Sequence, residues 1–185
     1  MVSIPSLWLP ILLSAVFVFL VSWVTHMLLT YHRSNFGQMP NESAVMAALR
    51  EAGVGPGNYF MPHADGPKAM SSPEWLDKCK QGPVGMVNVL PSGPPNMGKS
   101  LGKWFLFLLV VSLFAAYLTG RTQGPGAGYL GVFRVAGCSA FMAYGLGEVM
   151  NTIWKGQKGS TTVKHVFDGL IYALVTGGTF GWLWP

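Results

Sequence analysis

Four long apolar stretches constrain the fold of this chain more than any other feature of its sequence. Each reaches the length of about 20 residues that a helix needs to cross the hydrocarbon core of a bilayer. Charged residues make up only 10% of the 185 residues, whereas a soluble domain carries about 25%. The sequence therefore predicts an all-α membrane protein with four transmembrane helices. The four stretches are Leu7–Tyr31, Leu101–Gly120, Tyr129–Trp154 and Val163–Trp184.

The apolar stretches divide the chain into three parts. Residues 1–31 are the first transmembrane helix, and residues 101–185 hold transmembrane helices 2 to 4. Residues 32–100 are the one sizeable segment outside the membrane. Because this segment is short and rich in proline and glycine, we expect a small α+β unit without a large core of its own.

Turn residues mark out the secondary structure of the 32–100 segment. One helix is predicted to begin at Asn41 and to end at Gly53, since asparagine favours the first position and glycine the last. A second helix is predicted to follow Ser72, because the next residue is a proline that suits the first turn. Two β-prone runs, residues 58–61 and 85–90, are expected to pair as a hairpin.

Basic residues are distributed unevenly between the two sides of the predicted bundle. One side has only Arg121 near a span end, whereas the other side has six lysines or arginines. By the positive-inside rule, the richer side is cytoplasmic. We therefore expect a multi-pass protein of the bacterial inner membrane, with segment 32–100 cytoplasmic and both termini periplasmic. Because the basic residues lie beside helix ends, they suit contact with a lipid bilayer and do not suit binding to nucleic acid. The six residues are Arg33, Lys99, Lys103, Lys155, Lys158 and Lys164.

Small residues recur every three or four positions in the last two spans. Such spacing removes side-chain bulk from one helix face and allows a neighbouring helix to approach closely. We expect these faces to pack the two spans against each other or against another subunit. In the fourth span the stripe is Gly169, Ala173, Gly177 and Gly181; in the third it is Ala136, Ala140, Ala143 and Gly147.

Ionisable side chains inside apolar helices are costly, which makes them candidates for function. His26, Glu148 and Asp168 lie in three different spans, each about 8–10 Å from the cytoplasmic boundary at ~1.5 Å per residue. Asn151 and His165 each lie about one turn from a member of this group. A shared polar site would serve as a proton relay, a cation site or a ligand pocket.

Two observations keep simpler interpretations open. Lys103 and Lys164 lie near the same boundary, and Lys164 can pair with Asp168 at a spacing of four residues. Arg134 lies about 7 Å inside the outer boundary, on a side of the bundle that has no Asp or Glu. Its partner within the chain is a backbone carbonyl, the hydroxyl of Ser139 or Thr179, or the terminal carboxylate of Pro185. A lipid phosphate or an acid of another subunit would also serve.

Cofactor and catalytic motifs are sparse. His26 and His165 lie at similar depth and could hold a haem, and His26 alone could hold a chlorophyll, although their spacing is not diagnostic. No set of metal ligands or catalytic residues is apparent, and we expect neither a metal nor an enzyme. The stretch Gly93–Ser100 matches a phosphate loop in spacing, but its two prolines remove the amide donors that such a loop needs.

Three stretches resemble a group of uncharacterised bacterial four-helix inner-membrane proteins. They are Pro56–Pro62, Gly82–Pro91 and Phe167–Trp184. The resemblance implies a bacterial membrane protein with this order of loop and spans, and it implies nothing about a substrate.

The sequence supports three hypotheses of function. The first is a non-catalytic accessory or scaffold subunit of a larger respiratory, photosynthetic or transport complex, because the small-residue stripes and Arg134 suggest other membrane-protein subunits as partners. The second is a small proton- or cation-coupled transporter that uses the His/Glu/Asp cluster. The third is a haem- or chlorophyll-binding membrane subunit.

Overall fold

A computed structural model describes all residues from 1 to 185 and is mostly helical. The chain forms two compact units. The larger is a helix bundle made of Met1–Asn35, Asn96–Ile153 and Gln157–Pro185. The smaller unit contains Phe36–Pro95 together with Trp154–Gly156.

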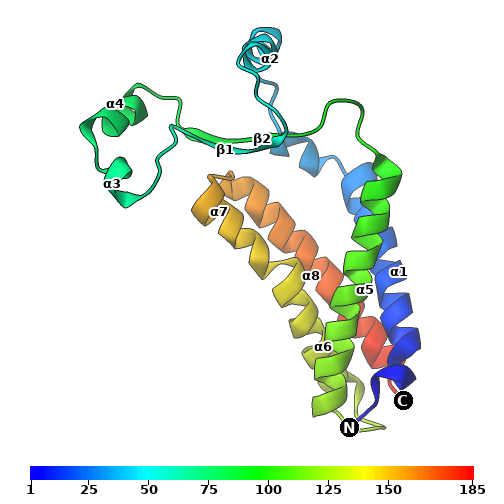
Figure 1. Ribbon diagram of the computed structural model, residues 1–185. Coiled ribbons are helices and arrows are strands. Elements are labelled where there is room, and N and C mark those ends of the chain that lie inside the picture. The colour runs from blue at the N-terminus through cyan, green and yellow to red at the C-terminus, as the bar shows by residue number, and fades with distance from the viewer. The chain divides into compact units, whose positions relative to one another are not determined.

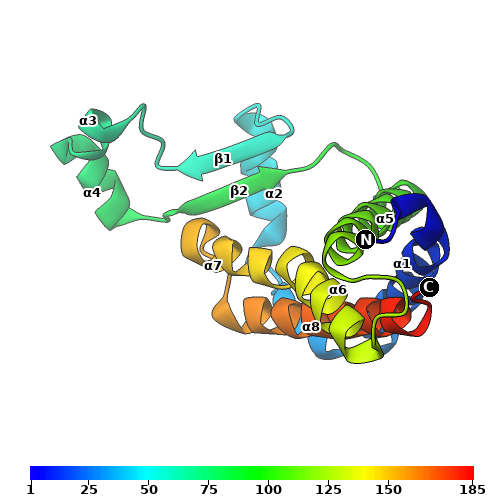
Figure 2. The ribbon, with the colours of Figure 1, turned by 90° about the horizontal axis from the view of Figure 1, so that it is seen from below.

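The bundle is built from four long helices. These are α1 (Trp8–Trp23), α5 (Met97–Thr122), α6 (Tyr129–Tyr144) and α8 (Gly159–Trp182), and the short α7 (Val149–Lys155) follows α6. In Figures 1 and 2, α1 lies along α5 and α6 lies along α8. Both helix pairs pack through buried residues, so the bundle has an interior in which polar side chains can meet.

Short segments of tighter or looser helix extend the long ones. Ile4–Leu7 is a 3₁₀ turn before α1, and Val24–Leu28 is a π-helix after it. Another 3₁₀ turn, Tyr31–Asn35, follows and is called the Tyr31–Asn35 turn below. It returns the chain towards α8.

Three helical segments are long and apolar enough to cross a membrane: Ile4–Leu28, Met97–Thr122 and Tyr129–Lys155. Their outward side chains are large and apolar; Leu106 and Phe114, for example, are more than half exposed. Exposed apolar surface of this kind is expected where a protein meets lipid. α8 has 24 residues, enough in length, but Lys164 and Asp168 reduce its apolar character. The count of four spans therefore stays a prediction.

The third span is not the continuous helix that we expected. α6 ends at Tyr144, and a 3₁₀ turn, Leu146–Glu148, separates it from α7. The break lies where the backbone of Gly145 meets α8: a Cβ on Gly169 would lie only 2.5 Å from the Cα of Gly145.

The small-residue stripe of α8 faces α6. A Cβ added at Gly177 would lie 2.8 Å from the carbonyl oxygen of Phe133, and one at Gly181 would lie 2.7 Å from the ring of Tyr129. Ala173, one turn before Gly177, is buried in the same stripe. The stripe is thus used inside the chain, where it leaves room for the backbone and aromatic rings of α6.

The stripe of α6 follows a different row from the expected one. Ala136 and Ala140 are buried, and the row continues with Tyr144. Ala143 and Gly147 are exposed instead. The contact row of α6 repeats every four residues, at 136, 140 and 144, so positions 143 and 147 lie beside it and not on it.

Both chain termini lie at the end of the bundle where α5 connects to α6 (Figure 1). The amide of Val2 donates to the carbonyl of Gly120 at 2.8 Å, and the amide of Gly126 donates to the carbonyl of Pro185 at 2.7 Å. The Tyr31–Asn35 turn lies at the opposite end, beyond α1.

The smaller unit contains a hairpin and three short helices. The predicted hairpin is confirmed: β1 (Gly57–Met61) pairs antiparallel with β2 (Gly85–Val89). The helices are α2 (Glu42–Glu51), α3 (Pro67–Met70) and α4 (Pro73–Gln81).

The helix ends of the smaller unit differ in how they are capped. The hydroxyl of Ser72 accepts a hydrogen bond from the amide of Trp75 at 3.2 Å, as its position before α4 predicts. Asn41 precedes α2, but its backbone is left-handed and its side chain makes no capping bond. Gly53 ends α2 with a φ of 68°, a conformation that favours glycine.

Candidate functional site

A cavity of about 520 Å³ lies inside the bundle, at the end near the Tyr31–Asn35 turn. Most of its lining is aromatic or aliphatic, and includes Trp104, Phe107 and Tyr172. Its ionisable lining residues come from three separate segments: His26, Glu148, His165 and Asp168. Pockets of this kind, mostly apolar with a few convergent polar groups, are typical of ligand sites.

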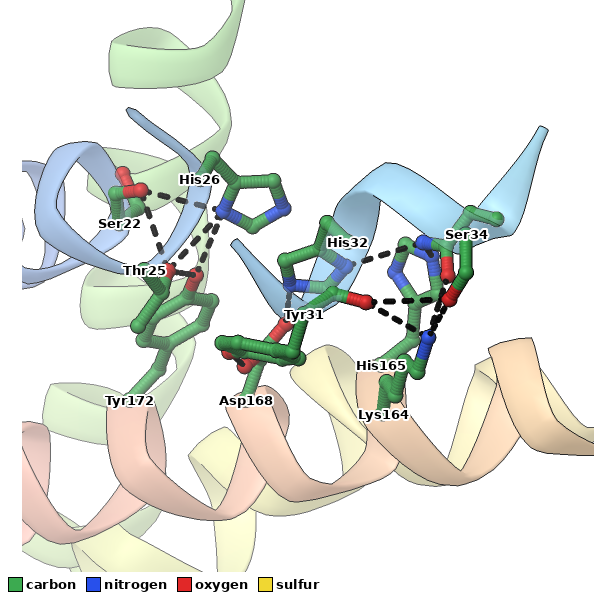
Figure 3. A network of polar contacts seen from close by, with 11 residues as sticks. Ser22, Thr25, His26, Tyr31, His32, Ser34, Lys164, His165, Asp168 and Tyr172 are labelled. Atoms are coloured by element: carbon green, nitrogen blue, oxygen red, sulfur yellow. Dashed lines mark hydrogen bonds and ion pairs between the residues drawn. The ribbon is translucent and has the colours of Figure 1, made fainter. Parts of the chain in front are cut away.

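Asp168 is at the centre of the polar contacts, and it is only 2% exposed. One carboxylate oxygen accepts a hydrogen bond from the hydroxyl of Tyr31. The other lies 2.7 Å from Nε2 of His32. Figure 3 shows how both partners reach down from the Tyr31–Asn35 turn towards α8. Asp168 therefore joins two segments that are far apart in sequence.

Lys164, four residues before Asp168 on α8, also binds the Tyr31–Asn35 turn. Its Nζ donates to the carbonyl of Tyr31 at 2.6 Å, to Oγ of Ser34 at 2.7 Å and to Oδ1 of Asn35 at 3.3 Å. No ion pair joins Lys164 to Asp168, so the local pairing that the spacing allowed is not formed. Both side chains bind the Tyr31–Asn35 turn instead.

His32 is the residue that links the histidines. Its Nδ1 lies 2.9 Å from Nδ2 of Asn35, and this amide nitrogen also lies 3.4 Å from Nε2 of His165. Because an amide nitrogen only donates, His32 accepts at Nδ1 and carries its proton on Nε2, which points at Asp168. Burial lowers the pKa of His32, against the effect of Asp168, so we assign it as neutral at pH 7.

Tyr31 also keeps its proton. Burial raises the pKa of its hydroxyl, and the hydrogen bond to Asp168 adds to this effect. Two neutral groups, the hydroxyl of Tyr31 and the ring of His32, therefore lie against the carboxyl oxygens of Asp168, and no lysine or arginine contacts them.

His26 lies at the edge of this group, within the π-helix. Its Nδ1 is 3.1 Å from the carbonyl of Ser22 and 2.9 Å from Oγ1 of Thr25. Thr25 in turn is 2.9 Å from the hydroxyl of Tyr172. The His26 ring is exposed and stacks on that of His32, with centroids 4.3 Å apart. Helices of the π type are frequent at functional sites.

Glu148 lines the same cavity but belongs to a separate contact. Its Oε2 accepts a hydrogen bond from Nδ2 of Asn151 at 2.9 Å. No hydrogen bond or ion pair connects Glu148 to His26 or Asp168. The structure therefore brings His26, His165 and Asp168 into one cluster, and Glu148 lines the same cavity without a bond to that cluster.

Arg134 lies outside this site. Its side chain is exposed on α6 and makes no hydrogen bond or ion pair within the chain.

A porphyrin does not fit between His26 and His165 in this arrangement. Their ring centroids are 6.5 Å apart, but the His32 ring lies 4.3 Å from one and 5.4 Å from the other. The space that a haem plane would need is therefore occupied by an imidazole. The haem hypothesis has no support from the geometry.

His32 and Tyr31 were not among the residues predicted for this site. Both follow the apolar helical segment Ile4–Leu28, and only the Tyr31–Asn35 turn brings them back to α8. A signal was present: a tyrosine and a histidine next to each other, one turn beyond a span that already contains His26.

Comparisons with protein-family models, with curated proteins and with solved structures found no match to this chain.

Proposed function

We propose that this chain is a small multi-pass carrier of the bacterial inner membrane that binds a cation in the bundle cavity. The observation that supports this most is that His26, Glu148, His165 and Asp168, from three segments, line one cavity. Ionisable groups within a membrane bundle mark ion and substrate pathways because their burial is otherwise unfavourable. α8 is the fourth span in this proposal.

The charge of the cavity favours a cation. Glu148 and Asp168 are acids, while His32 is neutral and Lys164 directs its ammonium group to the Tyr31–Asn35 turn. Water-poor surroundings strengthen the attraction between a carboxylate and a bound cation. A cation that enters the cavity would therefore be attracted by both acids.

Replacing Glu148 by glutamine tests this proposal. The side chain keeps its shape and loses its charge, so we expect cation uptake into proteoliposomes to fall by roughly tenfold or more, as the loss of a charge-assisted contact implies. Uptake is measured with ion-sensitive dyes for monovalent and divalent cations. Glu74→Gln is the control, because Glu74 is an exposed acid of the smaller unit that bonds only Lys78. Equal uptake by Glu148→Gln and the unchanged protein would refute the carrier.

A second candidate, an accessory subunit of a larger membrane complex, is favoured by Arg134. An exposed arginine on an apolar helix that pairs with no acid of its own chain needs a lipid phosphate or a partner's carboxylate. Native mass spectrometry of gently extracted protein separates the two functions. A heteromeric mass, combined with no uptake by the isolated chain, would favour the accessory subunit.

The proposed topology places the smaller unit in the cytoplasm and both termini in the periplasm, as the lysine distribution indicates. The chain has two free thiols, Cys79 in the smaller unit and Cys138 on α6. In a Cys138→Ser variant we expect an impermeant maleimide to label Cys79 in inside-out vesicles and not in intact spheroplasts. Labelling of Cys79 in intact spheroplasts would show that the smaller unit lies in the periplasm, opposite to the proposed topology.

A further inference from the structure

Three donor groups from three segments converge beside the cavity. His26 comes from the π-helix, His32 from the Tyr31–Asn35 turn and Asp168 from α8, and one ligand atom of each lies within 4.8 Å of the others. In a tetrahedral zinc site, neighbouring ligand atoms are about 3.3 Å apart, as bond lengths near 2.0–2.1 Å require. Small side-chain movements would therefore bring all three to one ion.

We propose that His26, His32 and Asp168 form a binding site for a divalent transition-metal ion of the Zn²⁺ type. Two imidazoles with one carboxylate are the ligands of many zinc and iron(II) sites, whereas Mg²⁺ and Ca²⁺ prefer oxygen alone. The inference rests on the proposed function in so far as it names the class of cation that the cavity takes.

Three protein ligands leave a coordination position open. Both His26 and Asp168 line the cavity, so the open position faces it. Sites of this kind exchange a fourth ligand, whereas structural zinc sites use four protein ligands. His165 also lines the cavity, and its ring lies 5.4 Å from that of His32, close enough to supply this fourth ligand.

Binding requires a change in the proton position of His32. Its Nδ1 accepts from Asn35 and its Nε2, 2.7 Å from Asp168, carries the proton, so the proton must move to Nδ1 before Nε2 can bind a metal. Asn35 then has to turn its amide so that Oδ1 accepts from Nδ1. Lys164 loses its 3.3 Å contact with Asn35 and keeps those to Tyr31 and Ser34. The step is balanced, because one proton changes nitrogen and none leaves the protein.

The same rotation of Asn35 frees another ligand. At present Nδ2 of Asn35 lies 3.4 Å from Nε2 of His165, and the turned amide would no longer donate to it. Asn35 is therefore a positioning residue that acts through two histidines. Tyr31 acts similarly on the carboxylate, because its hydroxyl still donates to the other oxygen of Asp168. Such outer contacts fix the orientation of metal ligands.

His26 must also turn. Its ring is nearly parallel to that of His32, at 11°, and parallel rings direct their lone pairs side by side rather than at one point. The contacts of His26 are all at Nδ1, which leaves Nε2 available. Because the side chain is exposed, it has room for this rotation.

The test is a Co²⁺ titration of the full-length protein in detergent, followed by visible absorption and by competition with Zn²⁺. We expect one saturable site per chain. Removing a ligand in His26→Ala or His32→Ala should weaken binding by about 100-fold or more, beyond the 10- to 100-fold typical of outer contacts. His63→Ala is the matched control, since His63 also faces an aspartate, Asp65, at 3.0 Å but is exposed in the smaller unit. Unchanged affinity in His26→Ala, which leaves the bond between His32 and Asp168 in place, would overturn the metal site.

Two variants of Asn35 test whether this residue orients His32 for metal binding or only stabilises the Tyr31–Asn35 turn. Asn35→Asp offers a carboxylate to Nδ1 of His32 and should bind Co²⁺ at least as tightly as the unchanged protein, whereas Asn35→Leu should bind roughly 10- to 100-fold less tightly. A purely structural role predicts equal loss in both, and that result would overturn the role of Asn35 in metal binding.

Metal binding and transport can fail separately. Co²⁺ binding without uptake in proteoliposomes would refute the carrier and leave the metal site. Uptake without Co²⁺ binding would refute the metal site alone.

Discussion

Replacing Gly169 with alanine is expected to destabilise the bundle by about 3 kcal/mol or more, at the upper end of overpacking effects. The new Cβ would lie 2.5 Å from Cα and 2.6 Å from N of Gly145, and 2.7 Å from the carbonyl carbon of Tyr144. All three are backbone atoms, so no side-chain rotation relieves the clash. The two helices would have to move apart along their contact. The measurement is the free energy of unfolding of the purified protein in mixed micelles.

Gly147→Ala is the matched control for this change. Gly147 belongs to the stripe predicted for the third span, but a Cβ there meets nothing within 4 Å. We expect its stability to change by no more than about 0.5 kcal/mol. Equal stability of the two variants would show that α6 and α8 do not approach as closely as described.

Removing the carboxylate of Asp168 is the second change with a large expected effect. Asp168→Ala leaves the buried hydroxyl of Tyr31 without its acceptor and removes the carboxylate oxygen that lies 2.7 Å from Nε2 of His32. A buried donor left unpaired costs about 1 to 3 kcal/mol in free energy of unfolding. Because the Tyr31–Asn35 turn then keeps only its contacts with Lys164, His165 and the ring of His26, we also expect faster proteolysis at this turn.

Asp77→Ala is the control for Asp168→Ala. Asp77 pairs with Lys80 on the surface of the smaller unit at 3.1 Å, and exposed pairs contribute only about 0–1 kcal/mol. If both variants lost the same stability, the contacts of Asp168 would not hold the turn. Asp168→Asn, which preserves the size of the side chain and one acceptor, should fall between the two.

Several features of the site could be predicted from helical position alone. His26, Glu148 and Asp168 were expected at one depth, with His165 about one turn from Asp168, and the structure brings His26, His165 and Asp168 together. Glu148 was expected in the same group. It lines the cavity but bonds Asn151, because the break after Tyr144 alters the direction of the following residues.

The contacts that complete the site depend on a turn that local sequence does not determine. The 3₁₀ turn at Tyr31–Asn35 is stabilised by Asp168 and Lys164, more than 120 residues away in the chain. Neither the role of Lys164 nor that of His32 follows from spacing within one helix. Spacing alone favoured a pair between Lys164 and Asp168. In the structure Asp168 instead contacts the side chains of Tyr31 and His32, and Lys164 donates to oxygen atoms of the same turn.

What the sequence by itself determined is the presence of apolar helices long enough to cross a membrane, the hairpin in the smaller unit and the small-residue face of α8. These features depend on local composition and periodicity, which act within a few residues. Only the tertiary structure decided that α6 breaks at Gly145, that Ala143 and Gly147 leave the packing face, and that His32 joins His26 and Asp168. Each of these depends on which helix faces meet. The bilayer does not specify that choice, because lipid is as apolar as the side chains, so close packing and buried hydrogen bonds decide it.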